Sequence, residues 1–239
     1  MASGCSLGRR AAPTRRRRSN NGSRIADRYG RSFVAFGGSK GYGSIRLSIL
    51  LVAVLVLALQ FADAQSRTGP TLVRHDFTES AQGWRISGDT DADEPILSTS
   101  GGHPGGCITG VDEALGETWY FRAPAAVLRR LPAAANGTVS YSLKQSGAII
   151  SLIDDDVVIV GPAGRLSYRF RTAPGTDWTD FSVRLSEGEG WTWNWNRRAT
   201  QAQIDSVLAA PTRLEIRGEY VTCPDEAALD NFVLTAALK

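Results

Sequence analysis

The stretch TVSYSLK, Thr138–Lys144, alternates polar and apolar side chains at every position. Val139, Tyr141 and Leu143 share one face of an extended strand, because successive side chains of a strand point to opposite sides. The same period of two returns in Arg165–Phe170, RLSYRF. This alternation predicts antiparallel sheets with one face buried and the other exposed.

Short apolar runs of this kind, separated by Gly, Pro, Asp and Asn, extend outward over residues 71–238. One segment, Ala199–Leu208, instead has helical spacing, with Thr200 as its N-cap. Because no βαβ alternation is visible, we expect one all-β domain over 71–238, an antiparallel β-sandwich or jelly roll with one short helix. The expected strands are Leu72–Phe77, Gly83–Ile86, Ile96–Thr99, Trp119–Arg122, Thr138–Lys144, Ala148–Ile153, Val157–Val160, Arg165–Phe170, Trp178–Leu185, Arg213–Tyr220 and Leu229–Thr235.

The N-terminal part has a different composition. Residues 1–46 are basic and rich in Gly and Ser, which predicts a disordered leader. Residues 47–64 combine an apolar run, Leu47–Leu59, with small residues at Ala62 and Ala64, the pattern of a secretory signal cleaved after Ala64. The run is shorter than the roughly 20 residues of a membrane span. The long leader leaves a second interpretation open, an uncleaved signal anchor. The sequence therefore predicts a secreted or periplasmic domain, or a single-pass anchored one with the β domain outside.

The charge of the chain is concentrated in that leader. Ten arginines, one lysine and two aspartates lie in the first 64 residues, so the remainder holds 16 basic and 22 acidic residues. An acidic domain does not favour a phosphate-binding surface, and we expect no nucleic-acid partner.

Several short segments follow one another in a recognisable order. In this order over Val73–Leu234, they resemble the laminin B domain, also called laminin domain IV type A. The resemblance implies a jelly roll related in shape to carbohydrate-binding modules, with an extracellular, non-enzymatic role in adhesion or matrix binding. The cysteine-rich repeats that flank this domain in laminins do not occur in this sequence. The segments are His75-Asp76-Phe77, Gly83-Trp84, Gly116 with Trp119-Tyr120-Phe121 and Ala123-Pro124, Asp154–Val160, Trp178 with Phe181, Val183 and Leu185, Gly190-Trp191, Leu214–Tyr220 and Leu229–Leu234.

Jelly-roll modules similar to this one carry a structural calcium ion where the first and last strands meet. The resemblance therefore implies a site with Asp76 from the first strand and Asp230 from the last, and with Asp112 from a Gly-rich loop as a third ligand. Carboxylate oxygens are ligands that Ca²⁺ prefers. In the alternative interpretation, Asp76 and Asp230 accept hydrogen bonds from neighbouring backbone and hold no metal.

The segment Trp191–Asn196, WTWNWN, is a candidate glycan site. In an extended strand its three indoles share one face. Trp193 and Trp195 would then stack on sugar rings, while Asn194 and Asn196 bind hydroxyl groups. In the alternative, Trp191 is a core residue and the other two cover the domain edge. We thus expect an extracellular glycan or a matrix protein as partner.

Other chemistry is sparse. Cys107 and Cys223 form an even pair in an exported domain, which predicts a disulfide, with two buried free thiols as the alternative. Asn136 begins a glycosylation sequon that matters only in a host that glycosylates. The run Asp154–Asp156 predicts a hairpin turn. Because no motif assembles a nucleophile with a base, we expect no enzyme activity.

Overall fold

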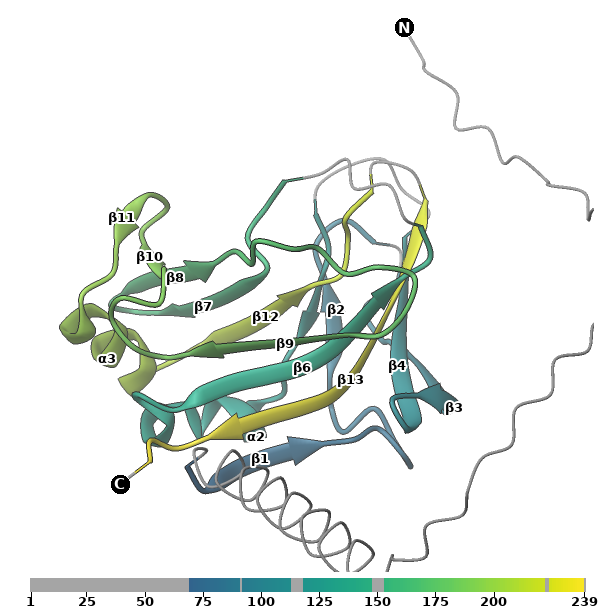
Figure 1. Ribbon diagram of the computed structural model, residues 1–239, viewed down its shortest axis with the longest axis horizontal. Coiled ribbons are helices and arrows are strands. Elements are labelled where there is room, and N and C mark those ends of the chain that lie inside the picture. The colour runs from purple at the N-terminus through teal and green to yellow at the C-terminus, as the bar shows by residue number, and fades with distance from the viewer. Residues whose placement is uncertain (1–68, 91, 113–117, 148–152, 222–223, 239) are drawn as a thin grey trace, which may run out of the picture. The chain divides into compact units, whose positions relative to one another are not determined.

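The computed structural model describes residues 69–90, 92–112, 118–147, 153–221 and 224–238. These residues form two antiparallel sheets that face each other, with the long strands β6, β9 and β13 in one layer and β7, β8 and β12 in the other (Figure 1). The expected all-β sandwich is confirmed.

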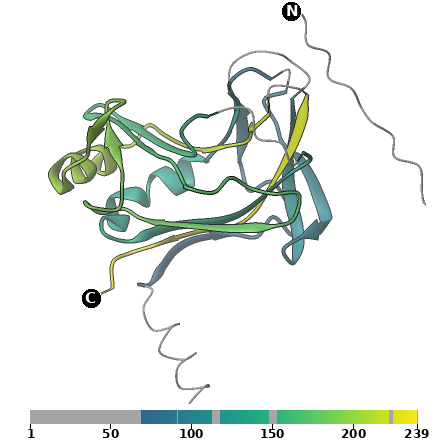
Figure 2. The same cartoon turned by 45° about the horizontal axis from the view of Figure 1, so that its top comes forward.

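The first sheet is built around its longest strand, β13, which lies between β4 and β6 and also pairs with β1. Its order is β3-β4-β13-β6-β9, and the rotated view shows β1 beneath β13 at one edge (Figure 2). Its strands are β1 (Thr71–His75), β3 (Ile96–Gly102), β4 (Gly105–Asp112), β6 (Thr138–Gln145), β9 (Thr179–Arg184) and β13 (Asp225–Thr235).

The second sheet has the order β11-β10-β8-β7-β12-β5-β2. Two α-helices and a 3-10 helix complete the described structure: α2 (Ala125–Leu128), η1 (Leu131–Ala134) and α3 (Gln201–Ala209). The strands are β2 (Arg85–Ser87), β5 (Tyr120–Arg122), β7 (Val157–Gly161), β8 (Gly164–Tyr168), β10 (Thr192–Trp193), β11 (Arg197–Arg198) and β12 (Arg213–Arg217).

The core lies between the sheets and follows the predicted alternation. Val139, Tyr141 and Leu143 of β6 are at most 2% exposed. Their neighbours Ser140, Ser142 and Lys144 belong to the opposite, outer face of the sheet, because strand side chains alternate. The alternation at Thr138–Lys144 therefore determines which face of β6 is available for ligands.

Trp119 fills the space between the layers and is fully buried. Two glycines permit this packing: a Cβ atom on Gly110 would lie 2.4 Å from the indole, and one on Gly218 would lie 2.0 Å from it. Both distances are far below van der Waals contact, so these positions need glycine.

The short helix begins where the sequence predicts it. Helix α3 has Thr200 as its N-cap, and Thr200 and Gln203 form a reciprocal capping box. The strand β4 was not expected, because the glycines from Gly101 to Gly106 resemble a loop in sequence.

In the expected strand Ala148–Ile153, residues 148–152 lie outside the described residues, as does the leader 1–64. Within the described part of the chain, no helix is long and apolar enough to cross a membrane.

Candidate functional site

Three side chains form a ridge on the outer face of the first sheet: His103, Lys144 and Trp178. The indole Nε1 of Trp178 and the Nζ of Lys144 both donate to the carbonyl of Gly101, at 3.3 and 3.4 Å. The Lys144 Nζ lies 4.7 Å from the centre of the indole ring. The His103 ring stacks on the same indole with 6.1 Å between centroids. These contacts hold the Trp178 ring in one orientation.

The ridge is assembled from segments that are far apart in the chain. Lys144 projects from β6, Trp178 directly precedes β9, and His103 lies in the connection between β3 and β4. Asp230 of β13 anchors that connection by accepting a hydrogen bond from the His103 backbone N–H at 2.6 Å. Asn231 donates a side-chain hydrogen bond to the His103 carbonyl.

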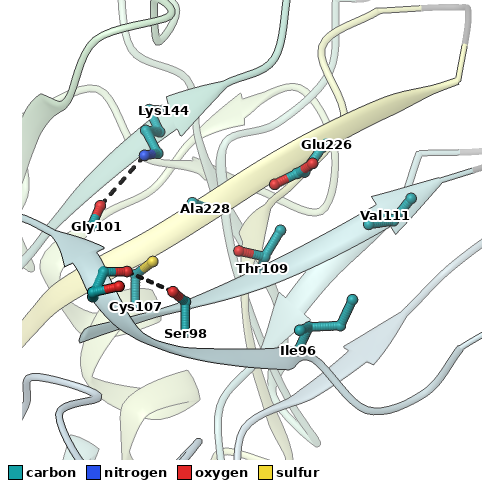
Figure 3. Close-up of a pocket in the computed structure, with 10 residues that line it drawn as sticks. Ile96, Ser98, Gly101, Cys107, Thr109, Val111, Lys144, Glu226 and Ala228 are labelled. Carbon is teal, nitrogen blue, oxygen red and sulfur yellow. Dashed lines mark hydrogen bonds between the residues drawn. The ribbon is translucent and has the colours of Figure 1, made fainter.

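On one side of the ridge is a hollow of about 310 Å³, here called the strand-edge hollow, which includes Lys144. Figure 3 shows its side chains rising from β3, β4, β13 and β6 toward a common space, with Lys144 bonded to Gly101. Its lining is mixed, because hydroxyl groups and one carboxylate alternate with apolar side chains: Ile96, Ser98, Cys107, Thr109, Val111 and Glu226.

On the other side is a second hollow of about 360 Å³, here called the serine hollow. Ser142 donates to the Asp180 carboxylate at 2.7 Å, and the His103 Nε2 lies 3.9 Å from the same oxygen. The side chain of Asp180 is 74% exposed, so its carboxylate remains accessible to a ligand. Serine, asparagine and charged side chains line the hollow: Arg74, Ser140, Ser142, Asp180, Ser182 and Asn231.

The three aspartates predicted to hold calcium do not converge. Asp112 pairs in register with Asp225, at the start of β13. Asp230 lies five residues further along that strand, about 16 Å away at 3.3 Å per residue. No group of three or more His, Cys, Asp or Glu side chains among the described residues could hold a metal. Asp112 is also not in a loop, since it ends β4 and is 1% exposed.

Asp76 and Asp230 show the backbone bonding of the alternative interpretation. Asp230 is fully buried, and its carboxylate accepts the backbone N–H groups of His103 and Asn231, each at 2.6 Å. Burial raises the pKa of Asp230, and the two backbone donors oppose that rise. Asp76 is exposed and accepts from the Thr78 N–H at 3.2 Å. Calcium stays a prediction from the sequence.

The predicted aromatic platform at WTWNWN is not flat. Trp191 is 2% exposed and belongs to the core, as the alternative interpretation proposed. Trp193 is partly buried, and its indole donates to the Ala163 carbonyl at 3.3 Å. Trp195 lies between β10 and β11, is 74% exposed and stacks with the Arg165 guanidinium at 4.3 Å.

The asparagines of this hairpin have different surroundings. The Asn194 side chain accepts a hydrogen bond from the Arg165 backbone N–H at 3.0 Å, so this oxygen fixes the turn. Asn196 is exposed. The hairpin therefore presents one exposed aromatic ring, that of Trp195, and one exposed amide, that of Asn196.

The remaining predicted residues lie apart from the ridge or at its margin. Cys107 is a buried free thiol in the strand-edge hollow, and burial raises its pKa. Cys223 lies outside the described residues. The disulfide between Cys107 and Cys223 therefore stays a prediction from the sequence. Asn136 is exposed, as a glycosylation acceptor must be.

The sequence did not single out Trp178, Lys144 or His103 as site residues. The three residues lie in separate segments of the sequence, at positions 103, 144 and 178, so no single motif contains them. One feature of the sequence did bear on the ridge: Lys144 lies on the polar face of TVSYSLK, which predicts that it is on the outer face of the sheet. The sequence did not indicate which residues of other strands would contact it.

Comparisons with known proteins agree with this architecture. The family model described as Laminin B (Domain IV) matches residues 120–239. The L4b domain of human laminin alpha-2 has a similar structure, with 15% identity and a TM-score of 0.50, over 70% of this chain and 99% of that domain. No curated protein matches the sequence.

Two carbohydrate-binding modules are also among the similar structures. A xylan-binding domain of Paenibacillus barcinonensis has 11% identity and a TM-score of 0.43, over 72% of this chain and 99% of that domain. A family 11 carbohydrate-binding module of a Clostridium thermocellum cellulase has 12% identity and a TM-score of 0.42, over 72% and 96%. The family model covers half of the chain and includes β6, β9, β13 and Trp178. The chain belongs to the laminin B (domain IV) family.

Proposed function

We propose that this protein is an exported, non-catalytic binding module that holds an extracellular glycan on the outer face of its first sheet. The observation that carries the proposal is the Trp178 indole, which is fixed by residues of both hollows. Gly101 and Lys144 line the strand-edge hollow and His103 lines the serine hollow, and these hollows contain hydroxyl, amide and carboxylate groups.

The chemistry of the ridge suits a sugar. A sugar ring offers C–H groups that pack on an aromatic face, and hydroxyl groups that need both donors and acceptors. The serine hollow supplies an acceptor at Asp180 and a donor at Arg74, and it adjoins the ridge at His103. Both hollows are open to solvent and contain polar groups, so bound water can bridge the remaining hydroxyl groups.

The export part of the proposal rests on Leu47–Leu59 and on Ala62 and Ala64, as argued from the sequence. Sequencing the N-terminus of protein recovered outside the cell tests it. A mature chain that begins at Gln65 supports cleavage, whereas a chain that retains residues 1–46 and sediments with membranes supports the anchored form.

Glycan binding is tested by screening the full chain on an array of extracellular polysaccharide fragments, then comparing two variants. Trp178→Ala removes the aromatic ring of the ridge, and we expect binding to fall about 5- to 150-fold, since a stacked ring contributes about 1–3 kcal/mol. Trp195→Ala is the matched control, because it removes an exposed indole outside the ridge.

The Trp195 control also tests a second candidate, a sugar platform on the hairpin. The observation in its favour is the 74% exposure of the Trp195 side chain. Loss of binding in Trp195→Ala with none in Trp178→Ala would move the site to the hairpin. Binding that survives in both variants refutes both locations.

A further inference from the structure

A pocket of about 180 Å³ opens at the end of the second sheet, where β8 and β12 end and β7 begins. Here it is called the arginine pocket, because three of the side chains that line it are guanidinium groups. Its lining includes Asp156, Arg169, Phe170, Arg171, Arg217 and Tyr220.

Arg217 is the buried member of this group, with 3% of its side chain exposed. Its Nε donates to the Glu219 carbonyl at 2.5 Å and its Nη1 to the Asp154 carbonyl at 3.2 Å. The Tyr220 ring lies 4.2 Å from the guanidinium carbon and covers one face. The third nitrogen, Nη2, has no hydrogen-bond partner within the described residues. A buried charged donor of this kind is costly unless an acceptor reaches it.

The carboxylates nearby are already engaged. The two Asp156 oxygens accept hydrogen bonds from the Tyr220 hydroxyl at 2.8 Å and from the Phe170 N–H at 2.7 Å. Asp156 also lies 3.7 Å from the Arg217 Nη1. Although the sequence predicted a turn here, Asp156 is 4% exposed and fixes the ends of β8 and β12.

The two other arginines are more accessible. Arg169 has half of its side chain exposed and an Asp155 oxygen at 3.6 Å from its Nη2. Arg171 is exposed and makes no hydrogen bond or ion pair with the described residues. Positive charge therefore exceeds negative charge in the lining of the arginine pocket.

We infer that the arginine pocket binds an oxyanion, a sulfate or carboxylate group of an acidic ligand. Guanidinium groups bind such groups through paired, charge-assisted hydrogen bonds, and Arg217 is held in place to offer one. The domain beyond residue 64 has more acidic than basic residues, so a general attraction for anions does not account for binding here. The pocket belongs to the second sheet and is independent of the glycan proposal.

The test is an NMR titration of the full chain with sodium sulfate at constant ionic strength, with sodium chloride as the reference salt. We expect saturable shifts confined to the Phe170 and Arg171 amides and the Arg217 guanidinium. Arg169→Gln with Arg171→Gln should weaken sulfate binding at least about tenfold, as the loss of one charge-assisted contact predicts. Arg197→Gln with Arg198→Gln, two exposed arginines on β11, should leave it unchanged.

Two further measurements identify the class of ligand and distinguish a loss of binding from a loss of the fold. Sodium glucuronate and a heparin oligosaccharide distinguish a free ion from an acidic group carried on a sugar, which should bind more tightly than sulfate alone. Arg171→Gln by itself loses no partner and should keep the fold, so its weaker binding is attributable to the pocket. Equal weakening in the β11 variant, or shifts spread over all exposed arginines, would overturn the inference.

Discussion

The β10–β11 hairpin and the Trp178 ridge both present an indole at the surface, but they are built differently. The hairpin comes from one continuous segment, and two of its three tryptophans stabilise the fold. Trp191 lies in the core, and Trp193 packs over Gly164. In the ridge, Lys144 of β6 and Trp178 just before β9 both bond to the Gly101 carbonyl of β3, and Asp230 of β13 holds His103. A dense aromatic run therefore indicated packing, whereas an isolated tryptophan became the surface feature.

The two regions differ because different numbers of chain segments contact the indole rings of the hairpin and of the ridge. The position of a tryptophan within a short hairpin is determined by its own strand. Because strand side chains alternate, the ring points either into the core or toward solvent. Trp178 precedes its strand and contacts Gly101 at the end of β3 and His103 in the β3–β4 connection. Orientation by several distant segments is what makes a rigid recognition surface.

The largest expected effect comes from breaking the ridge at Gly102. A Cβ atom there would lie 2.0 Å from the Gly106 carbonyl oxygen and 2.8 Å from Asp230, so Gly102→Ala must displace backbone. We expect a loss of about 3 kcal/mol in the free energy of unfolding, measured by urea denaturation. Gly101→Ala is the control, because nothing lies within 4 Å of its Cβ and only its positive φ is strained. Equal losses in both variants would contradict the close approach.

Asp230→Asn should have the next largest effect. The substitution turns one acceptor into a donor that faces a backbone N–H, and the group is fully buried. We expect about 2 kcal/mol of destabilisation and displacement of His103 from the ridge. Asp76→Asn, at an exposed site, should cost less than about 0.5 kcal/mol. A midpoint lowered equally by both substitutions and by a chelator would instead establish the calcium site.

The pH dependence of stability is determined by buried acids that belong to neither the ridge nor the hairpin. Burial, and then the charges of Asp112 and Asp225, raise the pKa of Glu219 to about 7. Folding thus favours the protonated form, and this contribution to stability is present below pH 4.5, the ordinary value, and is lost as pH rises toward 7.

Glu219→Gln should therefore raise the denaturation midpoint at pH 7.5 relative to the parent protein, with the difference disappearing near pH 4.5. Thermal unfolding at several pH values measures this. Because burial also raises the pKa of Asp225 to about 6, some pH dependence should remain in the variant. A variant whose midpoint falls by the same amount at every pH would show that Glu219 is ionised and required in the fold.

Trp195→Ala should have the smallest effect on stability. Its ring is 74% exposed and loses only the stacking contact with Arg165, which is worth about 0.5 kcal/mol at an exposed site. Urea denaturation measures it. A loss above about 2 kcal/mol would mean that the hairpin supports the fold as much as the ridge does.

Much of the fold could be predicted because its signals are local. The alternation in TVSYSLK placed Val139, Tyr141 and Leu143 in the core, and Thr200 marked the start of α3. The strand β4 was missed, since its glycines permit the close packing of Trp119 and Phe77 while resembling a loop in sequence. The alternation of polar and apolar residues thus predicts which face of a strand is buried. Where another chain segment packs closely against a strand, glycines replace the apolar residues, and the strand is not recognised from the sequence.

By itself the sequence determined an all-β sandwich, the capped helix α3 and the likeness to the laminin B domain. Only the tertiary structure decided which outer-face residues meet. The register across β13 separates Asp112 from Asp230 and brings Asp230 to His103, and the ends of β8 and β12 bring Arg171 beside Arg217. Pairing between strands more than a hundred residues apart depends on the whole core, so no short stretch of sequence contains it.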